Sequence, residues 1–542
     1  MSNSTHTKIR YQVMWNRLLS VVEEQAKTLV RTAFSTSARE AGDISAGVFD
    51  MQGQMLAQAV TGTPGHVNSM ARSVIHFLNE FPAATMKAGD HYITNDPWKG
   101  CGHLYDMVVT SPAFHKGKMV GLFACTVHVV DVGGLGPSTD GKQVFHEGLF
   151  IPILPLAREG RLEEGLLKLI RANTREPIQV EGDIFALMAC NETGEKRLSA
   201  MMGEYGLPDL VDLGEHIINT SRAGMAAAIA KLPQGSWHNE MRIDGLSDPI
   251  DLKATVTIAG DHVHVDYAGT SPVQPAGINC PICYTEAYTA FGIKCIVAPS
   301  LPNNAGTLDA VRVTAPEGCI LNAPWPVAVN ARSTMGHMLP DVVFGALNQA
   351  MPGSVPAEGT SNLWNIRIGA GQGITGPETK GPAFMLLSFH SGGAGARPSL
   401  DGLSATPFPS GVRNVPVEVN ETIAPIVIWR KELRPDSGGV GEHRGGLGQR
   451  MEISRIDGES FGIFPTFERV KYPARGREGG GPGGRGRLSL ASGAELRAKG
   501  FQLIPAGERL VVEMPGGGGY GDPARRDPAK IARDRKHGIV TK

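Results

Sequence analysis

Residues 95–106, NDPWKGCGHLYD, lie at the centre of the stretch that decides how this chain is organised. They place His103 three residues before Asp106, and the apolar run 119–130, MVGLFACTVHVV, supplies a second histidine, His128. Two imidazoles and one carboxylate can hold a divalent metal on one face and leave its other positions open, whereas a structural zinc site is closed by four protein ligands. The alternative is that all three are ordinary hydrogen-bonded residues, because an HxxD spacing also arises by chance.

The local sequence favours a site over a chance spacing. Gly100 and Gly102 allow the backbone to bend tightly just before His103. The run 119–130 is typical of a buried strand, because it is rich in β-forming residues and is followed by two glycines. A histidine in such a strand needs a hydrogen-bond partner or a metal, since an unpaired buried polar group costs roughly 1–3 kcal/mol.

The length of 542 residues indicates more than one lobe. We expect an α+β fold: a multi-lobed mixed subunit with a long N-terminal helix, a metal-site lobe and a glycine-rich, β-dominated C-terminal lobe. A shift in composition near residue 233 places the boundary between an α/β lobe, 1–240, and a β-rich lobe with buried helices, 241–542. Apolar periodicity predicts helices over the following ranges: 11–34, 67–81, 162–202 with a break at 176–177, 284–297 and 338–349.

The 69 glycines, well above the usual ~7%, predict many tight turns and irregular loops. Residues 479–484 satisfy GxGxxG, but neither a parallel strand before them nor a helix after them is predicted, so we interpret them as turns between strands. The sequence also lacks the GxxxxGK[ST] phosphate loop. Nucleotide binding by this chain is therefore not expected.

Charge and composition exclude several classes of partner. A formal net charge of −1 argues against electrostatic capture of nucleic acid or of an anionic membrane. The start of the chain, MSNSTHTKIR, lacks the apolar core of a signal peptide, and no apolar run is long enough to span a membrane. Seven cysteines without disulfide-type clustering predict reduced thiols and a cytoplasmic location.

Several long motifs occur in an order that resembles one known family. They are 31–70, RTAFSTSAREAGDISAGVFDMQGQMLAQAVTGTPGHVNSM; 95–106; 127–139, VHVVDVGGLGPST; 146–156, HEGLFIPILPL; 329–353, VNARSTMGHMLPDVVFGALNQAMPG; 435–450, PDSGGVGEHRGGLGQR; and 515–523, PGGGGYGDP. The chain resembles the hydantoinase B family along nearly its whole length. That family includes the B-type halves of ATP-dependent hydantoinases and 5-oxoprolinases, the caprolactamase β subunit, and corresponding subunits of acetone and acetophenone carboxylases.

The resemblance implies a division of labour between two subunits. ATP with Mg²⁺ would bind an A-type, hydantoinase A-like partner with an actin-like kinase fold, and this chain would hold one divalent metal, zinc or manganese. The two would form a hetero-oligomer that acts on a small molecule. Metal-activated water could then attack a carbonyl carbon whose oxygen the partner has phosphorylated.

Roles for the remaining polar residues follow from the same motifs. By resemblance, Asp43 and His66 fall in segments that line the active site. We expect Asp43 or Asp96 to act as general base, if burial raises its pKa. His66, Asn95 and Asp131 are expected to order water and bind substrate.

Three functions remain open at this point. The main hypothesis is the metal-binding, hydrolytic subunit of an ATP-dependent cyclic-amide hydrolase of the hydantoinase, oxoprolinase or lactamase type. The second is a subunit of a biotin-independent, ATP-dependent ketone carboxylase, in which the same pocket would hold bicarbonate or CO2 and exclude water. The third is a non-catalytic structural subunit of such a complex.

Overall fold

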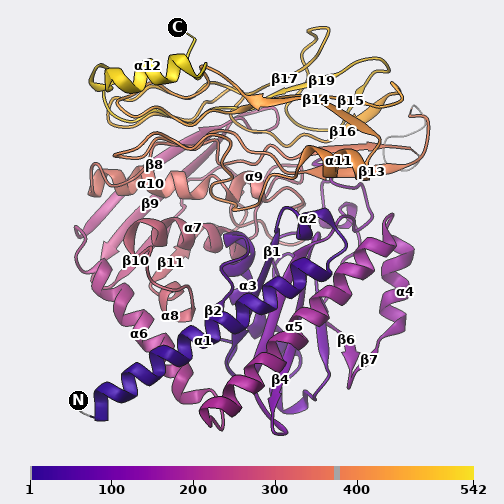
Figure 1. Cartoon of the computed structure of the whole chain (residues 1–542), viewed down its shortest axis with the longest axis vertical. Coiled ribbons are helices and arrows are strands. Elements are labelled where there is room, and N and C mark those ends of the chain that lie inside the picture. The colour runs from indigo at the N-terminus through magenta and orange to yellow at the C-terminus, as the bar shows by residue number, and fades with distance from the viewer. Residues whose placement is uncertain (1–2, 372–378, 542) are drawn as a thin grey trace.

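The computed structural model describes residues 3–371 and 379–541 and shows a mixed α/β fold with several sheets (Figure 1). This confirms the predicted fold class. The N-terminal half fills the lower part of the view, and the C-terminal strands and extended segments lie across its top. The predicted lobe boundary, 240/241, falls inside a strand, β8 (Gly235–Ile243), and one hydrophobic cluster joins residues on both sides of it.

The metal motif lies in a seven-stranded antiparallel sheet of the order β2-β1-β5-β4-β3-β6-β7. Its strands are β1 (Ile44–Phe49), β2 (Met55–Gln58), β3 (His91–Thr94), β4 (Asp106–His115), β5 (Lys118–His128), β6 (Leu154–Arg158) and β7 (Arg161–Leu162). β4 and β5 are almost entirely buried because both faces of the sheet are covered. β1 and β2 form an antiparallel hairpin at the edge of the sheet.

Helices cover both faces of this sheet. α1 (Asn3–Thr32) and α5 (Pro177–Tyr205) pack on one face, and α3 (Pro64–Glu80) packs on the other. Alternation along the strands directs Val109 and Val127 toward α5, whereas Val108 and Ala124 lie in the cluster that contains α3. The predicted break near residue 177 is confirmed, since α4 (Glu164–Asn173) ends there and Pro177 opens α5.

A second, four-stranded sheet of the order β11-β10-β9-β8 lies beside the first. Besides β8 it contains β9 (Ile250–Ala259), β10 (His262–Asp266) and β11 (Val311–Thr314). It packs on α7 (Ile282–Val297) and α10 (Leu339–Ala350), which confirms both predicted buried helices. The remaining helices outside the C-terminal region are α2 (Thr36–Arg39), α6 (Val211–Ile229), α8 (Ala305–Leu308) and α9 (Ser333–Gly336).

Two further sheets pack around one hydrophobic cluster in the C-terminal region. The first has the order β13-β12-β16-β18 and contains β12 (Ile366–Ala370), β13 (Phe384–Ser388), β16 (Phe461–Ile463) and β18 (Gln502–Ile504). The second has the order β14-β15-β19-β17 and contains β14 (Ile426–Leu433), β15 (Gln449–Arg455), β17 (Arg487–Leu490) and β19 (Leu510–Glu513). α11 (Val417–Ile423) and α12 (Pro528–Lys536) lie at the rim.

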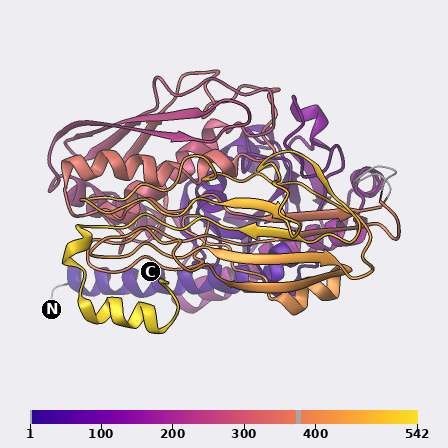
Figure 2. The ribbon, with the colours of Figure 1, turned by 90° about the horizontal axis from the view of Figure 1, so that it is seen from above.

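Beside these sheets, extended segments run together without forming a ladder, as the view from above shows (Figure 2). We call residues 391–396, 437–448, 474–486 and 515–521 the glycine layer. The N–H groups of Gly516 and Gly519 donate to the carbonyl oxygens of Gly484 and Gly481, which belong to one neighbouring segment. The two residues between them donate to other segments, Gly517 to Gly446 and Gly518 to Glu358. Residues three apart thus face the same neighbouring segment. This is the periodicity of a polyproline II helix, which makes no internal hydrogen bonds.

The glycine layer depends on close contact between backbones. A Cβ added to Gly517 would lie 2.0 Å from the carbonyl oxygen of Ala394, and one added to Gly445 would lie 1.9 Å from that of Gly517. The interpretation of 479–484 as turns between strands is therefore confirmed only at its start, where Gly479 has a φ of +92° and the N–H of Gly480 donates to the carbonyl oxygen of Arg477. Gly480 and Gly483 instead pack against neighbouring backbone, where an added Cβ would lie 2.2 Å from a carbonyl oxygen.

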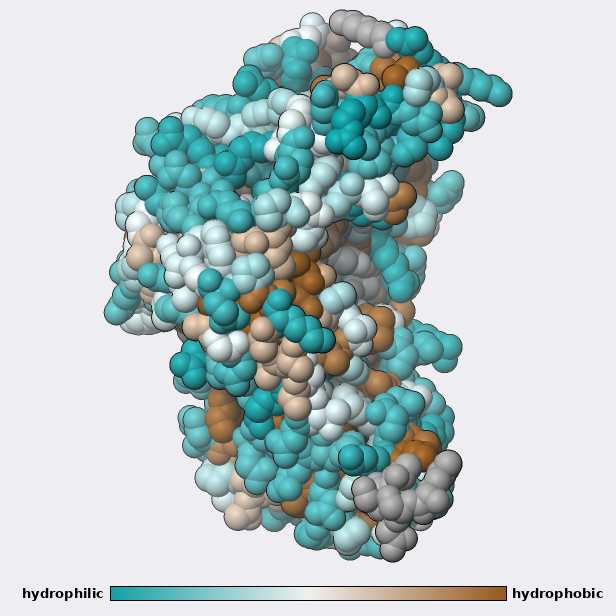
Figure 3. All heavy atoms as spheres, turned by 90° about the vertical axis from the view of Figure 1, so that its left-hand side faces the viewer, coloured by the Kyte–Doolittle hydropathy of each residue, from teal (hydrophilic) through white to brown (hydrophobic). Residues whose placement is uncertain are grey.

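The side of the molecule nearest the second sheet is mainly hydrophilic, with hydrophobic side chains gathered in its middle third (Figure 3). Among the described residues, no helix combines the length and apolar character that crossing a bilayer requires.

Candidate metal centre

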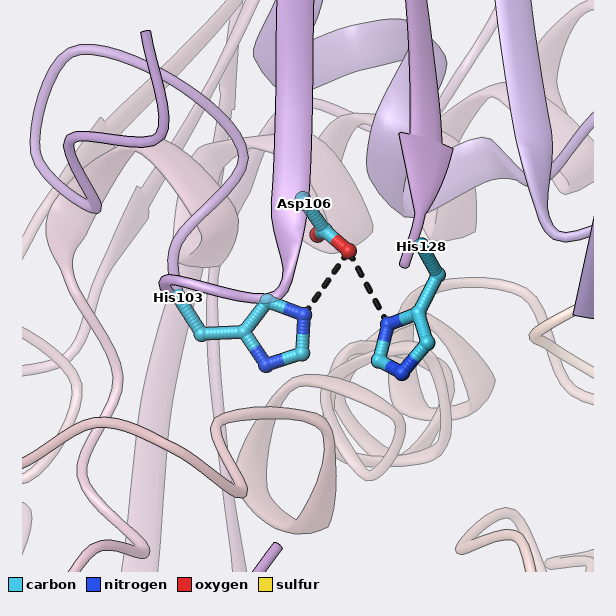
Figure 4. Close-up of side chains that lie close together, drawn as sticks. All are labelled: His103, Asp106 and His128. Carbon is cyan, nitrogen blue, oxygen red and sulfur yellow. Dashed lines mark hydrogen bonds and ion pairs between the residues drawn. The ribbon is translucent and has the colours of Figure 1, made fainter. Parts of the chain in front are cut away.

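The three predicted metal donors meet where β4 begins and β5 ends (Figure 4). The register of the sheet pairs Asp106 directly with His128, and the preceding loop returns His103 to the same place. His103 Nε2 lies 2.8 Å from Asp106 Oδ1, and His128 Nδ1 lies 3.1 Å from that same oxygen. All three side chains are buried. One carboxylate oxygen therefore has an imidazole nitrogen on each side.

The tautomer of His103 is determined by its other nitrogen. His103 Nδ1 lies 2.8 Å from the carbonyl oxygen of Asn330, which can only accept, so Nδ1 carries the proton. Burial lowers the pKa of His103 to about 3, with a contribution from Arg332, and the ring is neutral at physiological pH. Its Nε2 therefore directs a lone pair at Asp106.

The carboxylate it faces is charged. Burial opposes this charge, but Arg332 and His66 hold the pKa of Asp106 well below its usual value. A nitrogen lone pair thus lies 2.8 Å from a carboxylate oxygen, with no proton available to join them. A cation between these atoms would remove the repulsion. The hydrogen bond from Nδ1 to a backbone carbonyl also matches the support that metal-binding histidines usually have.

The second oxygen of Asp106 is held by cationic groups. Arg332 Nη2 donates to Oδ2, and His66 Nε2 lies 3.0 Å from it. Arg332 is fixed by a 2.6 Å hydrogen bond from Nε to the carbonyl oxygen of Cys101 and by packing over the ring of Tyr284, 4.0 Å from its centroid. Gly102 allows this approach, because a Cβ there would lie 2.6 Å from Arg332 Cδ. Arg332 thus keeps Asp106 ionised and oriented.

Asp43 and His66 lie beside the three donors, in agreement with the expectation that their segments line the site. Asp43 lies just before β1, with Oδ1 3.4 Å from His66 Nδ1 and Oδ2 4.0 Å from His128 Nδ1. Burial opposes a charge on His66, but Asp106 and Asp43 together raise its pKa above the ordinary value. His66 therefore lies between two carboxylates that favour its protonated form. Asp43 provides a further oxygen beside the donors.

These side chains open onto a small cavity between the two halves of the chain. Its volume is about 30 Å³, which is room for a few atoms rather than for a whole cyclic amide. From the N-terminal half it is lined by Asp43, His66, His103 and His128, and from the C-terminal half by residues that include Arg332, His337, Arg367 and Phe389. A substrate ring therefore has to enter by rearrangement of this junction or present only its reacting group.

Three predicted site residues do not reach the cavity. Asn95 uses its amide to bond the backbone of Leu104, Leu149 and Ile151. Asp96 accepts from the backbone of Trp98 at 2.9 Å, and burial raises its pKa. These side chains fix the loops that carry the donors, as Asx residues commonly do.

The side chain of Asp131 is likewise occupied by hydrogen bonds within the neighbouring loops. Its Oδ1 accepts from Arg175 Nη1 at 2.6 Å and from the backbone of Gly133. Asn95, Asp96 and Asp131 thus stabilise the neighbouring loops, and only Asp43 and His66 of the five predicted catalytic and substrate-binding residues line the cavity.

Sequence reasoning missed the residues that arrive from far along the chain. Asn330, Arg332 and His337 all lie in 329–353, a motif quoted for its resemblance and given no chemical role. Glu147 follows the strand of His128 among other polar residues and was likewise given no role. Its Oε1 accepts from the backbone N–H of Asn330 at 2.7 Å, and the carbonyl of Asn330 in turn receives the proton of His103. Burial raises the pKa of Glu147 to about 8.

With this geometry established, comparison with known proteins identifies the family. A family model described as hydantoinase B/oxoprolinase matches residues 7–523. The chain belongs to the hydantoinase B/oxoprolinase family. The B-type subunit of a putative D-/L-hydantoinase from Pseudomonas sp. (strain NS671) is 28% identical, with 98% of this chain and 93% of that protein covered.

Solved structures of two related assemblies share the fold of this hydantoinase B family member. The β subunit of caprolactamase from Pseudomonas jessenii is 29% identical over 99% of this chain and 95% of that one. A crystal structure of ATP-dependent caprolactamase from the same organism matches with a TM-score of 0.87 and 26% identity, over 98% and 94% of the two chains. Nucleotide-free acetone carboxylase matches with a TM-score of 0.85 at 19% identity, over 99% of this chain and 78% of that one, which shows a common fold.

Proposed function

We propose that this chain is the metal-binding, hydrolytic B-type subunit of an ATP-dependent cyclic-amide hydrolase. The observation that carries the proposal is the lone pair of His103 Nε2 directed at the charged Asp106, with His128 on the other side of the same oxygen. His103, Asp106 and His128 would hold one divalent metal, zinc or manganese, with Asp43 close enough to add an oxygen. When bound, the metal would supply Lewis acidity and lower the pKa of water.

The residues around the donors have distinct tasks in this proposal. Arg332 keeps Asp106 ionised through its hydrogen bond to Oδ2. Asp43 accepts the proton of the attacking water, because it is the carboxylate beside the cavity that no arginine neutralises among the described residues. His66 orients Asp43 from one side and Asp106 from the other, and its place in the cavity wall allows it to contact substrate.

The need for a partner follows from the chemistry of the amide. Resonance protects an unstrained lactam or imide carbonyl, and phosphorylation of its oxygen makes the carbon a better electrophile. We propose that an A-type subunit carries ATP and Mg²⁺ and performs that step, as the name of ATP-dependent caprolactamase suggests for that relative. The two chains would form a hetero-oligomer whose interface buries more than about 2,000 Å² in total. The seven free cysteines support a reducing, cytoplasmic setting.

The decisive assay uses this chain reconstituted with its A-type partner. The complex is given ATP and either a hydantoin or lactam or a small ketone, with and without labelled bicarbonate. We expect ATP-dependent ring opening that needs no bicarbonate. This chain without its partner should neither bind ATP tightly nor turn over substrate.

A ketone carboxylase subunit is the second candidate, and the fold shared with acetone carboxylase favours it. Label entering a β-keto acid, with no cyclic amide opened, would replace the hydrolase by the carboxylase. If the reconstituted complex remains active when His128 is replaced by alanine, this chain has a structural role alone.

A further inference from the structure

One arginine in the cavity wall lacks the partner that a buried charge requires. Arg367 lies on β12, in the C-terminal half of the chain, and only 8% of it is exposed. Its Nη1 donates to the carbonyl oxygen of Pro137 at 2.8 Å, and its Nε is buried without a hydrogen-bond partner among the described residues. Within residues 3–371 and 379–541, no carboxylate forms an ion pair with it.

Comparison with the other buried arginines shows how unusual this is. Four further arginines are buried in the part of the chain that the structure describes, and each is paired with a carboxylate. The pairs are Arg332 with Asp106, Arg444 with Asp534, Arg455 with Asp457 and Arg469 with Glu358. A buried charge without a counter-ion is strongly unfavourable, and arginine does not lose its proton under ordinary conditions. An external anion would correct this.

The two arginines of the cavity respond differently to burial. For Arg332, burial opposes the charge but Asp106 more than offsets it, so the pKa lies above the ordinary value. For Arg367, burial lowers the pKa, and no carboxylate among the residues that the structure describes offsets it. Arg332 is therefore already neutralised, whereas Arg367 retains an uncompensated positive charge toward the cavity it lines.

The cavity wall offers further polar atoms without partners. Thr63 Oγ1 and His337 Nδ1 are both buried and form no hydrogen bond with any residue that the structure describes, and both residues line the same cavity as Arg367. A hydroxyl and a neutral imidazole can each donate to an oxygen. Burial lowers the pKa of His337 to about 3, so this ring adds no charge. Arg367 is thus the charged member of a set of unused polar groups.

We propose that Arg367 binds an oxyanion of the substrate, on the wall of the cavity contributed by the C-terminal half. The oxyanion is either the phosphoryl group that activates the substrate or a carboxylate that the substrate carries. Guanidinium groups bind both in a forked geometry. The assignment deepens the proposed function and rests on it for the identity of the ligand. It makes Arg367 a specificity-determining residue, facing the His103–Asp106–His128 donors across the junction.

The experiment measures anion binding by the metal-stripped, full-length chain. Calorimetry follows titration with inorganic phosphate and, separately, with formate, for the unaltered chain, R367Q, R367K and the control R430Q. Arg430 lies on the exposed strand β14, away from the cavity. We expect saturable binding by the unaltered chain and by R430Q, at least tenfold weaker binding by R367Q, and an intermediate loss for R367K.

The two anions separate the two sources of the oxyanion. Tighter binding of phosphate assigns Arg367 to the activating phosphoryl group, and tighter binding of formate assigns it to a substrate carboxylate. Equal affinities of R367Q and the unaltered chain for both anions would overturn the proposal. So would failure of the unaltered chain to bind either one.

Melting temperatures show whether weaker anion binding by a variant is caused by misfolding. Removal of an uncompensated buried charge should leave R367Q at least as stable as the unaltered chain in anion-free buffer. Phosphate should raise the melting temperature of the unaltered chain and of R430Q but not that of R367Q. A structural arginine would give the reverse, with R367Q melting lower and the response to phosphate kept. Because no turnover is measured, these results are independent of whether the complex proves to be a hydrolase.

Discussion

At the ends of β4 and β5 the structure depends on which side chains are present, whereas in the glycine layer it depends on their absence. His103, Asp106 and His128 meet because strand register and a bent loop direct three polar side chains to one point. In the glycine layer, backbones approach so closely that a Cβ at Gly517 would lie 2.0 Å from a carbonyl oxygen. Substitution of a donor can therefore abolish metal binding while the fold is kept, whereas substitution of a closely packed glycine in the layer should cause loss of the fold.

The largest effect is expected from Gly517→Ala. The added methyl group would overlap the backbone of Ala394, which cannot move without disturbing neighbouring segments. We expect a loss of more than about 4–5 kcal/mol of unfolding free energy or failure to fold. Chemical denaturation measures it. The control is Gly203→Ala in α5, where nothing lies within 4 Å of the added Cβ, and it should be neutral or slightly stabilising. Equal stability of the two variants would refute the account of the glycine layer.

A smaller loss, about 3–5 kcal/mol, is expected from Asp106→Asn. This change leaves the buried Arg332 without its counter-ion and removes one metal donor. The double variant Asp106→Asn with Arg332→Met should recover most of the stability but none of the metal, as urea denaturation and elemental analysis can measure. If the double variant is no more stable than the single one, the pair is not the source of the loss.

The pH dependence of stability should identify Glu147. Its pKa of about 8 in the folded chain lies above the ordinary value of 4.5, so the folded state holds more protons between these pH values. Stability therefore falls as pH rises from about 4.5 to 8, by a few kcal/mol at most. In the metal-stripped chain, Glu147→Gln should remove this part of the slope and be the more stable form above pH 8. A control, Glu195→Gln on α5, should leave most of the slope in place.

The smallest effect on stability, within about 1 kcal/mol, is expected from His128→Ala in the metal-free chain, because no buried counter-charge is left behind. Its effect on metal content should be complete. Elemental analysis should find about one metal per chain before the change and none after it. Full metal occupancy in His128→Ala would show that the donors have been assigned wrongly.

The sequence predicted what is local and missed what is brought together by folding. His103, Asp106 and His128 lie within 26 positions of one another, and hairpin pairing converts that separation into contact. Arg332 and Arg367 come more than 200 positions later, and no periodicity marks an arginine that will lie in a cavity. Asn95, Asp96 and Asp131 share the motifs of the donors, but a polar side chain in a buried loop must satisfy backbone groups, and theirs do.

The glycine layer was hidden for a different reason. Helices and strands were found because side chains repeat with a period of 3.6 or 2. A segment such as 515–519, PGGGG, has no side chains to repeat, so its threefold backbone periodicity leaves no pattern of hydrophobicity. It resembles a flexible loop in sequence and is fixed by backbone contacts in structure.

The glycine layer has a consequence at the level of the coding sequence. Any single-base change that replaces a glycine codon with that of another amino acid adds at least a Cβ. No conservative substitution of these glycines therefore exists. For Gly445, Gly446 and Gly517, where that Cβ would lie 2.0 Å or less from a carbonyl oxygen, each missense change should act as a null allele. Mutational tolerance along this chain should therefore be lowest in a stretch that carries no catalytic side chain. A saturation screen scored only by abundance would detect the layer but would not detect His128.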